Sequence, residues 1–206
     1  MDLLFPFTKK FWVFTLQTWL DGGWVMVPLL VVSLLIFGVS INLFLHLRQR
    51  QFRHLSRDIL AAWVAAPAKS KGETGEIIRY TQEGSCSMDE IHNRFSEVIS
   101  ARVPFYDRGL LFLKALVASA PLLGLLGTVM GMLVTFKGLS VGGGKLVDII
   151  AQGISEALIT TEMGLLIAIP GYFLAHAIQR RKEEYEAFLV QLESCTLQHF
   201  NKRLPK

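Results

Sequence analysis

Residues 154–171 form a largely apolar stretch of the kind found in membrane helices, yet this stretch carries two carboxylates. Glu156 and Glu162 lie in its first half, together with the hydroxyls of Thr160 and Thr161. A charged side chain at the bilayer centre costs about 2.5–3.5 kcal/mol even on a lenient insertion scale, so such a residue normally faces a bundle interior or a wet cavity. The stretch therefore predicts a polar layer within a membrane helix. A helix that begins later, with both carboxylates outside the membrane, stays open as the alternative.

Three stretches of the chain are apolar enough to cross a bilayer. Residues 22–47 contain no Asp, Glu, Lys or Arg, and at about 1.5 Å per helical residue they can span a hydrocarbon core of about 30 Å. Lys114 and Lys137 bracket a second uncharged stretch. Only 18% of all residues are charged, against about 25% in soluble domains. We predict an all-α integral membrane protein with transmembrane helices at residues 22–47, 115–136 and 153–179.

Basic residues cluster after the first and the third predicted span. They are Arg48, Arg50, Arg53 and Arg57, and then Arg180, Arg181 and Lys182. Positive side chains remain on the cytoplasmic side of a membrane, which predicts a periplasmic amino terminus and a cytoplasmic carboxyl terminus. The net charge of +4 is thus explained by orientation in a lipid membrane, with no need for nucleic acid.

The remaining segments are assigned from this topology. Residues 1–21 predict a periplasmic amphipathic helix at the membrane interface. A simple hydrophobic packing helix stays open as the alternative. The pattern of these residues is not that of a cleavable signal. Residues 48–114 predict a cytoplasmic helical insertion, residues 137–152 a short periplasmic loop, and residues 180–206 a helical tail. The insertion and the tail together predict a cytoplasmic helical bundle that extends the spans.

Within the insertion, turn residues and a cap predict where helices begin and end. A helix over 48–66 should stop at Pro67, a loop should fill 67–75, and a short helix around 76–83 should stop at Gly84. Ser87 and Glu90 have the spacing of a capping box, which predicts a helix start. Pro104 should kink or break the helix that follows.

Small residues in the spans predict close helix packing. Gly127 and Gly131 form a small-xxx-small pair that lets helix backbones approach each other in lipid, and Gly124 and Gly164 extend this set of packing positions. Thr128 lies beside these glycines and should point toward another helix. The alternative is that its hydroxyl bonds to the backbone of its own helix.

The polar side chains should share one level in the membrane. Thr128 lies nine residues before Lys137 and Glu162 nine residues after Gly153, so both should lie roughly 13 Å from the outer surface. Thr161 shares this level but points about 100° away from Glu162, while Glu156 lies one turn further out, on a face with Thr160. Three spans cannot enclose such a layer alone, which predicts a homo-oligomer around a central axis, of open stoichiometry.

Other chemistry finds little support in the sequence. An intramembrane protease would need a pair such as Ser119 and His176, but Ser119 has no glycine-bracketed elbow or oxyanion loop around it. The histidines have no metal-ligand spacing, and no glycine-rich phosphate loop faces the cytoplasm, so we predict no enzyme, no metal and no cofactor. Cys86 and Cys195 are expected to be free buried thiols.

A carboxylate and hydroxyls in the middle of a membrane, without a nucleotide site, indicate a protein driven by an ion gradient.

Two segments resemble a known family. Residues 121–131 (Pro-Leu-Leu-Gly-Leu-Leu-Gly-Thr-Val-Met-Gly) and residues 154–170 (Ile-Ser-Glu-Ala-Leu-Ile-Thr-Thr-Glu-Met-Gly-Leu-Leu-Ile-Ala-Ile-Pro) resemble the signature of the ExbB/TolQ/MotA proton-channel family, and most closely its ExbB branch. Residues 22–30 are similar to the start of its first span. The resemblance covers the three spans and the topology.

The resemblance implies a pentamer of three-span subunits in the bacterial inner membrane, surrounding an ExbD- or TolR-like single-span partner whose aspartate carries the proton. Proton flow would energise a TonB-like protein for outer-membrane uptake; a Tol-type role in envelope maintenance and a passive scaffold stay open. By position, Thr128 and Thr161 resemble the hydroxyls that line the interior, and Glu156 the membrane glutamate of the third span. Glu162 departs from the family, which has a small apolar residue there; it could share the proton path or pair with a basic group.

Overall fold

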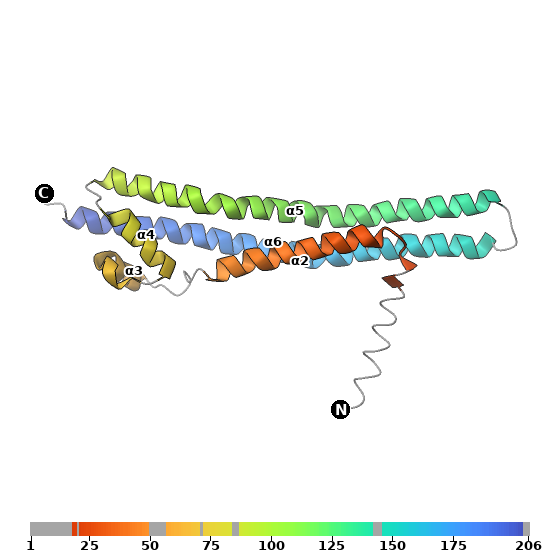
Figure 1. The fold of residues 1–206 in the computed structure, drawn as a ribbon, viewed down its shortest axis with the longest axis horizontal. Coiled ribbons are helices and arrows are strands. Elements are labelled where there is room, and N and C mark those ends of the chain that lie inside the picture. The colour runs from red at the N-terminus through yellow and green to blue at the C-terminus, as the bar shows by residue number, and fades with distance from the viewer. Residues whose placement is uncertain are drawn as a thin grey trace, which may run out of the picture. The chain divides into compact units, whose positions relative to one another are not determined.

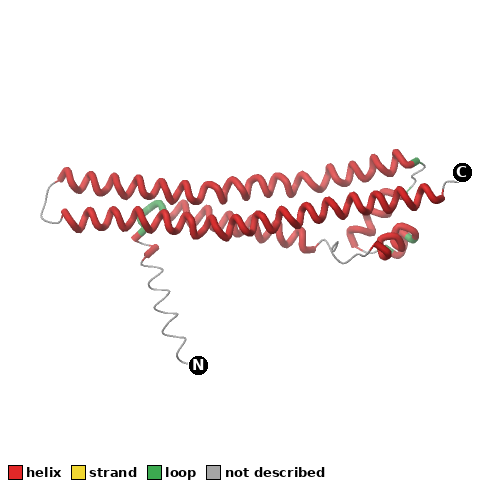
Figure 2. Tube along the Cα trace, turned by 180° about the vertical axis from the view of Figure 1, so that it is seen from behind, coloured by secondary structure: helices red, strands yellow, loops and turns green. Residues whose placement is uncertain are grey.

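The computed structural model describes residues 18–19, 21–49, 57–70, 72–83, 87–141 and 146–203. Every regular element within these ranges is a helix (Figure 2), which confirms the all-α class. The elements are α2 (Met26–Gln49), α3 (Arg57–Ala65), the 3-10 helix η1 (Pro67–Lys69), α4 (Gly72–Gln82), α5 (Met88–Val141) and α6 (Leu146–Arg203). Most of the predicted helix 1–21, residues 142–145 of the predicted loop 137–152, and Cys86 lie outside the described residues.

Three of these helices, α2, α5 and α6, are long and apolar enough to cross a membrane. The predicted spans 115–136 and 153–179 fall within α5 and α6, whereas the predicted span 22–47 begins four residues before α2. Only 22–28% of the most apolar stretch of each helix is buried inside the chain. Because most of these apolar side chains stay uncovered by the chain itself, lipid or further protein must cover them.

Of the boundaries predicted in the insertion, the loop 67–75 is wrong, and of the kink or break predicted at Pro104 the break does not occur. Helix α5 passes unbroken through Pro104. A proline removes one backbone hydrogen bond from a helix, but Ser100, whose carbonyl loses that partner, is exposed, so water can replace the lost donor. The predicted loop 67–75 holds η1 and the first turn of α4, which already begins at Gly72 with Glu73 in its first turn, where a carboxylate favours a helix.

The described helices divide into two compact units. The first unit comprises Met1–Ser40 and Phe112–Leu174, and the second comprises Ile41–Leu111 and Ala175–Lys206. In the first unit α5 and α6 lie side by side and run in opposite directions (Figure 1). The first part of α2 packs against this pair through a buried cluster of Val25, Met26 and Leu29, which is surrounded by Trp19, Leu123, Met130, Ile159, Met163 and Ile167.

The second unit has an apolar core with ion pairs at its edge. Tyr106 and Tyr185 meet edge to face, with ring centroids 6.3 Å apart, in the geometry that aromatic rings prefer. Lys182 Nζ lies 2.7 Å from Asp107 Oδ1 and 2.8 Å from Glu186 Oε1. Cys195 is a free, half-buried thiol.

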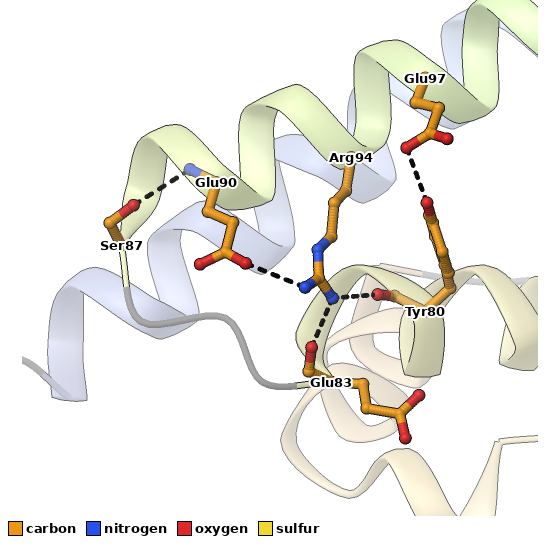
Figure 3. Close-up of polar contacts among 6 residues, drawn as sticks. All are labelled: Tyr80, Glu83, Ser87, Glu90, Arg94 and Glu97. Carbon is orange, nitrogen blue, oxygen red and sulfur yellow. Dashed lines mark hydrogen bonds and ion pairs between the residues drawn. The ribbon is translucent and has the colours of Figure 1, made fainter.

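Arg94 on α5 connects this helix to α4 within the second unit. Its guanidinium donates hydrogen bonds to the carbonyl oxygens of Tyr80 and Glu83, and to the carboxylate of Glu90 at 2.9 Å (Figure 3). The backbone N–H of Glu90 donates to Ser87 Oγ at 3.1 Å, which confirms the predicted cap of α5. The carbonyl of Tyr80 in the last turn of α4 and that of Glu83 just after it, which have no partners within the helix, are thus satisfied by an arginine on the next helix.

Candidate ion pathway beside the α5–α6 seam

Small residues form a seam along which α5 and α6 touch backbone to backbone. A Cβ atom added at Gly124 would lie 2.9 Å from the carbonyl oxygen of Thr160, and one added at Gly131 would lie 2.6 Å from that of Gly153. A Cβ atom added at Gly164 would lie 2.8 Å from the carbonyl oxygen of Ala120. No side chain fits at these separations, so the glycines permit the close approach that their spacing predicts.

Thr160 lies inside this seam. Its side chain covers Gly127, it is 0% exposed, and its hydroxyl is 3.0–3.1 Å from the carbonyl oxygens of Glu156 and Ala157 on its own helix. The sequence had placed Thr160 along the ion path. In the folded chain Thr160 is fully buried and packs against α5.

Thr128 and Thr161 are half-buried and lie at one level. Thr128 donates to the Leu125 carbonyl oxygen at 2.7 Å, which is the own-helix alternative named above. Thr161 Oγ1 lies 3.2 Å from the Ala157 carbonyl oxygen of its own helix and 3.4 Å from that of Gly124 on α5. This contact across the seam places Thr161 within about one turn of Thr128, as the depth estimate predicts.

Both hydroxyls also lie on the flank of the helix pair that α2 leaves uncovered. Helix α2 packs on Ile159 of α6 and on Met130 of α5. At about 100° per residue, Ile159 and Thr161 project to opposite sides of the seam residue Thr160. Met130 and Thr128 likewise project to opposite sides of Gly127. The two threonines therefore share one flank, and α2 occupies the other.

The two carboxylates point in other directions. Glu162 is exposed and projects about 160° away from the seam, among the exposed side chains of Leu158, Leu165 and Leu166. Glu156 is half-buried, and its carboxylate lies against Gly23, in the turn before α2. The predicted polar layer is thus divided into one hydroxyl flank, one carboxylate toward α2 and one carboxylate facing outward from the chain.

Sequence reasoning missed several members of this arrangement. On α6, where the sequence predicts Gly164 as a packing position, the seam also uses Gly153, Ala157 and Gly171, all buried. Gly22 and Gly23 contact α6 as well. Within the described ranges no three His, Cys, Asp or Glu side chains come together as metal ligands would.

The comparisons with known proteins show the family of the chain. Residues 41–190 match the model of the MotA/TolQ/ExbB proton channel family. The chain is 34% identical over 169 residues to the ExbB-like 1 biopolymer transport protein of Synechocystis sp., an alignment that covers 75% of this chain and 66% of that protein. It is 28% identical over 189 residues to the biopolymer transport protein ExbB of Salmonella typhimurium (80% of this chain and 75% of that protein). It is 34% identical over 100 residues to the Tol-Pal system protein TolQ of Haemophilus influenzae, an alignment that covers 48% of this chain and 41% of that protein. Because the family match covers well over half of its length, the chain belongs to the MotA/TolQ/ExbB proton channel family.

Proposed function

We propose that this chain is the multi-span subunit of a motor driven by the proton-motive force, and that it works with an ExbD-like partner to energise a TonB-like protein for outer-membrane transport. The membership in a proton channel family supports the ion-driven part. The relatives named ExbB support the transport part. One proton that crosses 100 mV releases about 2.3 kcal/mol, which is the energy such a motor would use.

The observation that carries this proposal is the shared flank of Thr128 and Thr161. Two hydroxyls at one level, on the side of a tightly packed helix pair that α2 does not cover, can face a common interior when several copies assemble. Hydroxyls can accept a hydrogen bond from a protonated carboxyl and donate one to a carboxylate. They therefore suit a partner's aspartate that gains and loses a proton. We assign Thr128 and Thr161 to the path and keep Glu162 as a further candidate.

The proposed assembly is a homo-pentamer in the bacterial inner membrane. The uncovered apolar surface of α2, α5 and α6 is available for lipid and for neighbouring copies. The basic residues at Arg48 and Arg180 support a periplasmic amino terminus and a cytoplasmic carboxyl terminus. In this orientation residues 48–114 and 180–206 form the cytoplasmic bundle.

A second function is favoured by one comparison. The similarity to a TolQ protein over 100 residues supports a Tol-type role in envelope maintenance, which would use the same motor for a different partner. A passive scaffold would use the hydroxyls only for contacts between helices, worth about 0.6 kcal/mol each.

Replacement of Thr128 and Thr161 by valine, which keeps the shape and removes the hydroxyl, tests the motor. Expressed in a strain that lacks the chain's own gene, the double variant should assemble like the wild type and fail to support uptake that depends on the proton-motive force. Thr135→Val is the matched control, since Thr135 is buried in the seam and bonds its own helix, and it should keep uptake. Normal uptake by the assembled double variant would favour the scaffold; loss of envelope integrity with normal uptake would favour the Tol-type role.

A further inference from the structure

The turn before α2 is built around a glycine that no other residue can replace without strain. Gly23 has a φ of +68°, in the left-handed region that disfavours side chains. Its carbonyl oxygen accepts the N–H of Met26 at 3.3 Å, and the carbonyl oxygen of Trp24 accepts that of Val27 at 3.1 Å. The turn therefore fixes the point and the direction in which α2 begins.

Glu156 fills the space that this glycine leaves open. Its carboxylate occupies the position that the Cβ atom of any other residue 23 would take, and its Cγ lies 3.3 Å from that position. One turn further along α6, Ile159 lies 3.1 Å from the position of a Cβ at Gly22. Two α6 side chains on one face thus bracket two consecutive glycines, so the turn before α2 lies directly on α6.

The charge of Glu156 suits this position. The first N–H groups of any helix have no partner within the helix, and they give its amino end a partial positive charge. Helix α2 has no acidic residue in its own first turn. A carboxylate supplied from α6 at the start of α2 can therefore compensate that charge, next to a segment in which Val25 and Met26 are buried.

We propose that Glu156 is a positioning residue that holds the amino end of α2 on α6, and that it is not a proton-carrying group of the path. Glu156 thereby keeps α2 on the flank opposite to Thr128 and Thr161 and leaves the hydroxyl flank uncovered. This assignment rests on the proposed function, because it separates the path-lining hydroxyls from a carboxylate that the sequence placed beside them.

A double-mutant cycle on the full chain in lipid nanodiscs tests the contact itself. Gly23→Ala should lower the Tm by at least about 5 °C, while the control Gly38→Ala, whose added Cβ meets nothing within 4 Å, should not lower it. When Glu156→Ala is added to Gly23→Ala, the combined loss should be smaller than the sum of the two single losses, because the carboxylate that clashes with the new Cβ is gone. If the Tm losses of the two single variants simply add in the double variant, Glu156 and Gly23 are not coupled and the proposal is overturned.

The Glu156 side chain alone gives a second measurement, which does not depend on folding of the glycine variant. Glu156→Ala should lower the Tm more than Glu162→Ala, since Glu156 is half-buried against Gly23 whereas Glu162 is exposed. Equal effects of the two replacements would contradict the proposal.

Proton-dependent uptake distinguishes a positioning role of Glu156 from a role in proton transfer. Glu156→Gln keeps the shape and an acceptor oxygen and removes only the charge, so it should lower the Tm less than Glu156→Ala does. It should keep proton-dependent uptake with an unchanged pH profile, while Glu156→Ala should lose most of that uptake. A Glu156→Gln protein with normal Tm and no uptake would place the carboxyl in the path and overturn the proposal. The proposed function fails by a different result, namely normal uptake with Thr128→Val and Thr161→Val, which leaves the Tm cycle untouched.

Discussion

Thr160 on α6 packs directly onto Gly127 on α5, so that a Cβ atom at position 127 would overlap the Thr160 side chain. Since Thr160 is fully buried and also bonds to its own helix, it has no room to withdraw. This contact sets how closely the two longest helices of the first unit approach, and thereby where the hydroxyls of Thr128 and Thr161 lie.

Gly127→Ala should therefore destabilise the first unit. Overpacking of a close contact costs about 1–3 kcal/mol, and here the neighbouring atoms belong to a short, buried side chain. The thermal unfolding temperature of the purified protein in lipid nanodiscs measures the effect. Gly38→Ala lies inside α2, and its added Cβ meets nothing within 4 Å, so it serves as the reference and should not lower this temperature.

Arg94→Ala should release α4 from α5 in the second unit. The guanidinium bonds two carbonyl oxygens of α4 and the carboxylate of Glu90, and hydrogen bonds to a charged group contribute about 1.5–3 kcal/mol each before solvent screening. Hydrogen exchange should become faster over Gly72–Gln82 and stay unchanged in the transmembrane part of α5. Unchanged protection of α4 in the variant would show that the arginine does not hold it.

Tyr80 should titrate above the ordinary range for tyrosine. Its hydroxyl donates to Glu97 Oε2 at 2.6 Å, and this hydrogen bond to a carboxylate raises the pKa of Tyr80 above its usual value of 10.0. Because the folded-state pKa is the higher one, the contribution to stability is present below the unfolded pKa and is lost as the pH rises through the folded value. The tyrosinate difference spectrum between the wild type and Tyr80→Phe measures this pKa, and Glu97→Gln should return it toward 10.0.

Lys182→Met should destabilise the second unit, whereas Lys182→Arg should largely preserve it. The ammonium lies between Asp107 and Glu186 with only 15% of its side chain exposed. Its removal leaves two neighbouring carboxylates without their cation, and because Asp107 itself is half exposed we expect a loss of about 1–2 kcal/mol, below the 3–5 kcal/mol typical of fully buried pairs. Denaturation monitored by circular dichroism distinguishes the two variants. A Met variant as stable as the Arg variant would contradict this account of the ion pair.

Features set by local chemistry could be predicted from the sequence. The uncharged stretches gave the three long helices, and the Gly127 and Gly131 spacing indicated the close seam. The Ser87 cap followed from a four-residue pattern. Each of these depends on neighbours within about two turns of one helix, where the period of the side chains is known.

Features set by contacts between distant segments could not be predicted. The meeting of Glu156 with Gly23 needs both the helix register and a left-handed turn, neither of which appears in a residue pattern. The same register buries Thr160 and separates Glu162 from the threonines. Helix α5 continues through Pro104, which removes the hydrogen-bond donor of the Ser100 carbonyl. Because Ser100 is exposed, water can replace that donor, and helix propensities do not take such exposure into account.

If Thr128 and Thr161 line the proton path, the threonines of several packed copies must enclose a common interior in the membrane. An electron cryo-microscopy structure of the full chain assembled in lipid nanodiscs would show whether they do. We expect a closed ring in which both threonines of every copy face an interior sealed from lipid, with α2 on the outside. A ring whose threonines face acyl chains, or a chain that remains a single subunit in lipid, would contradict it.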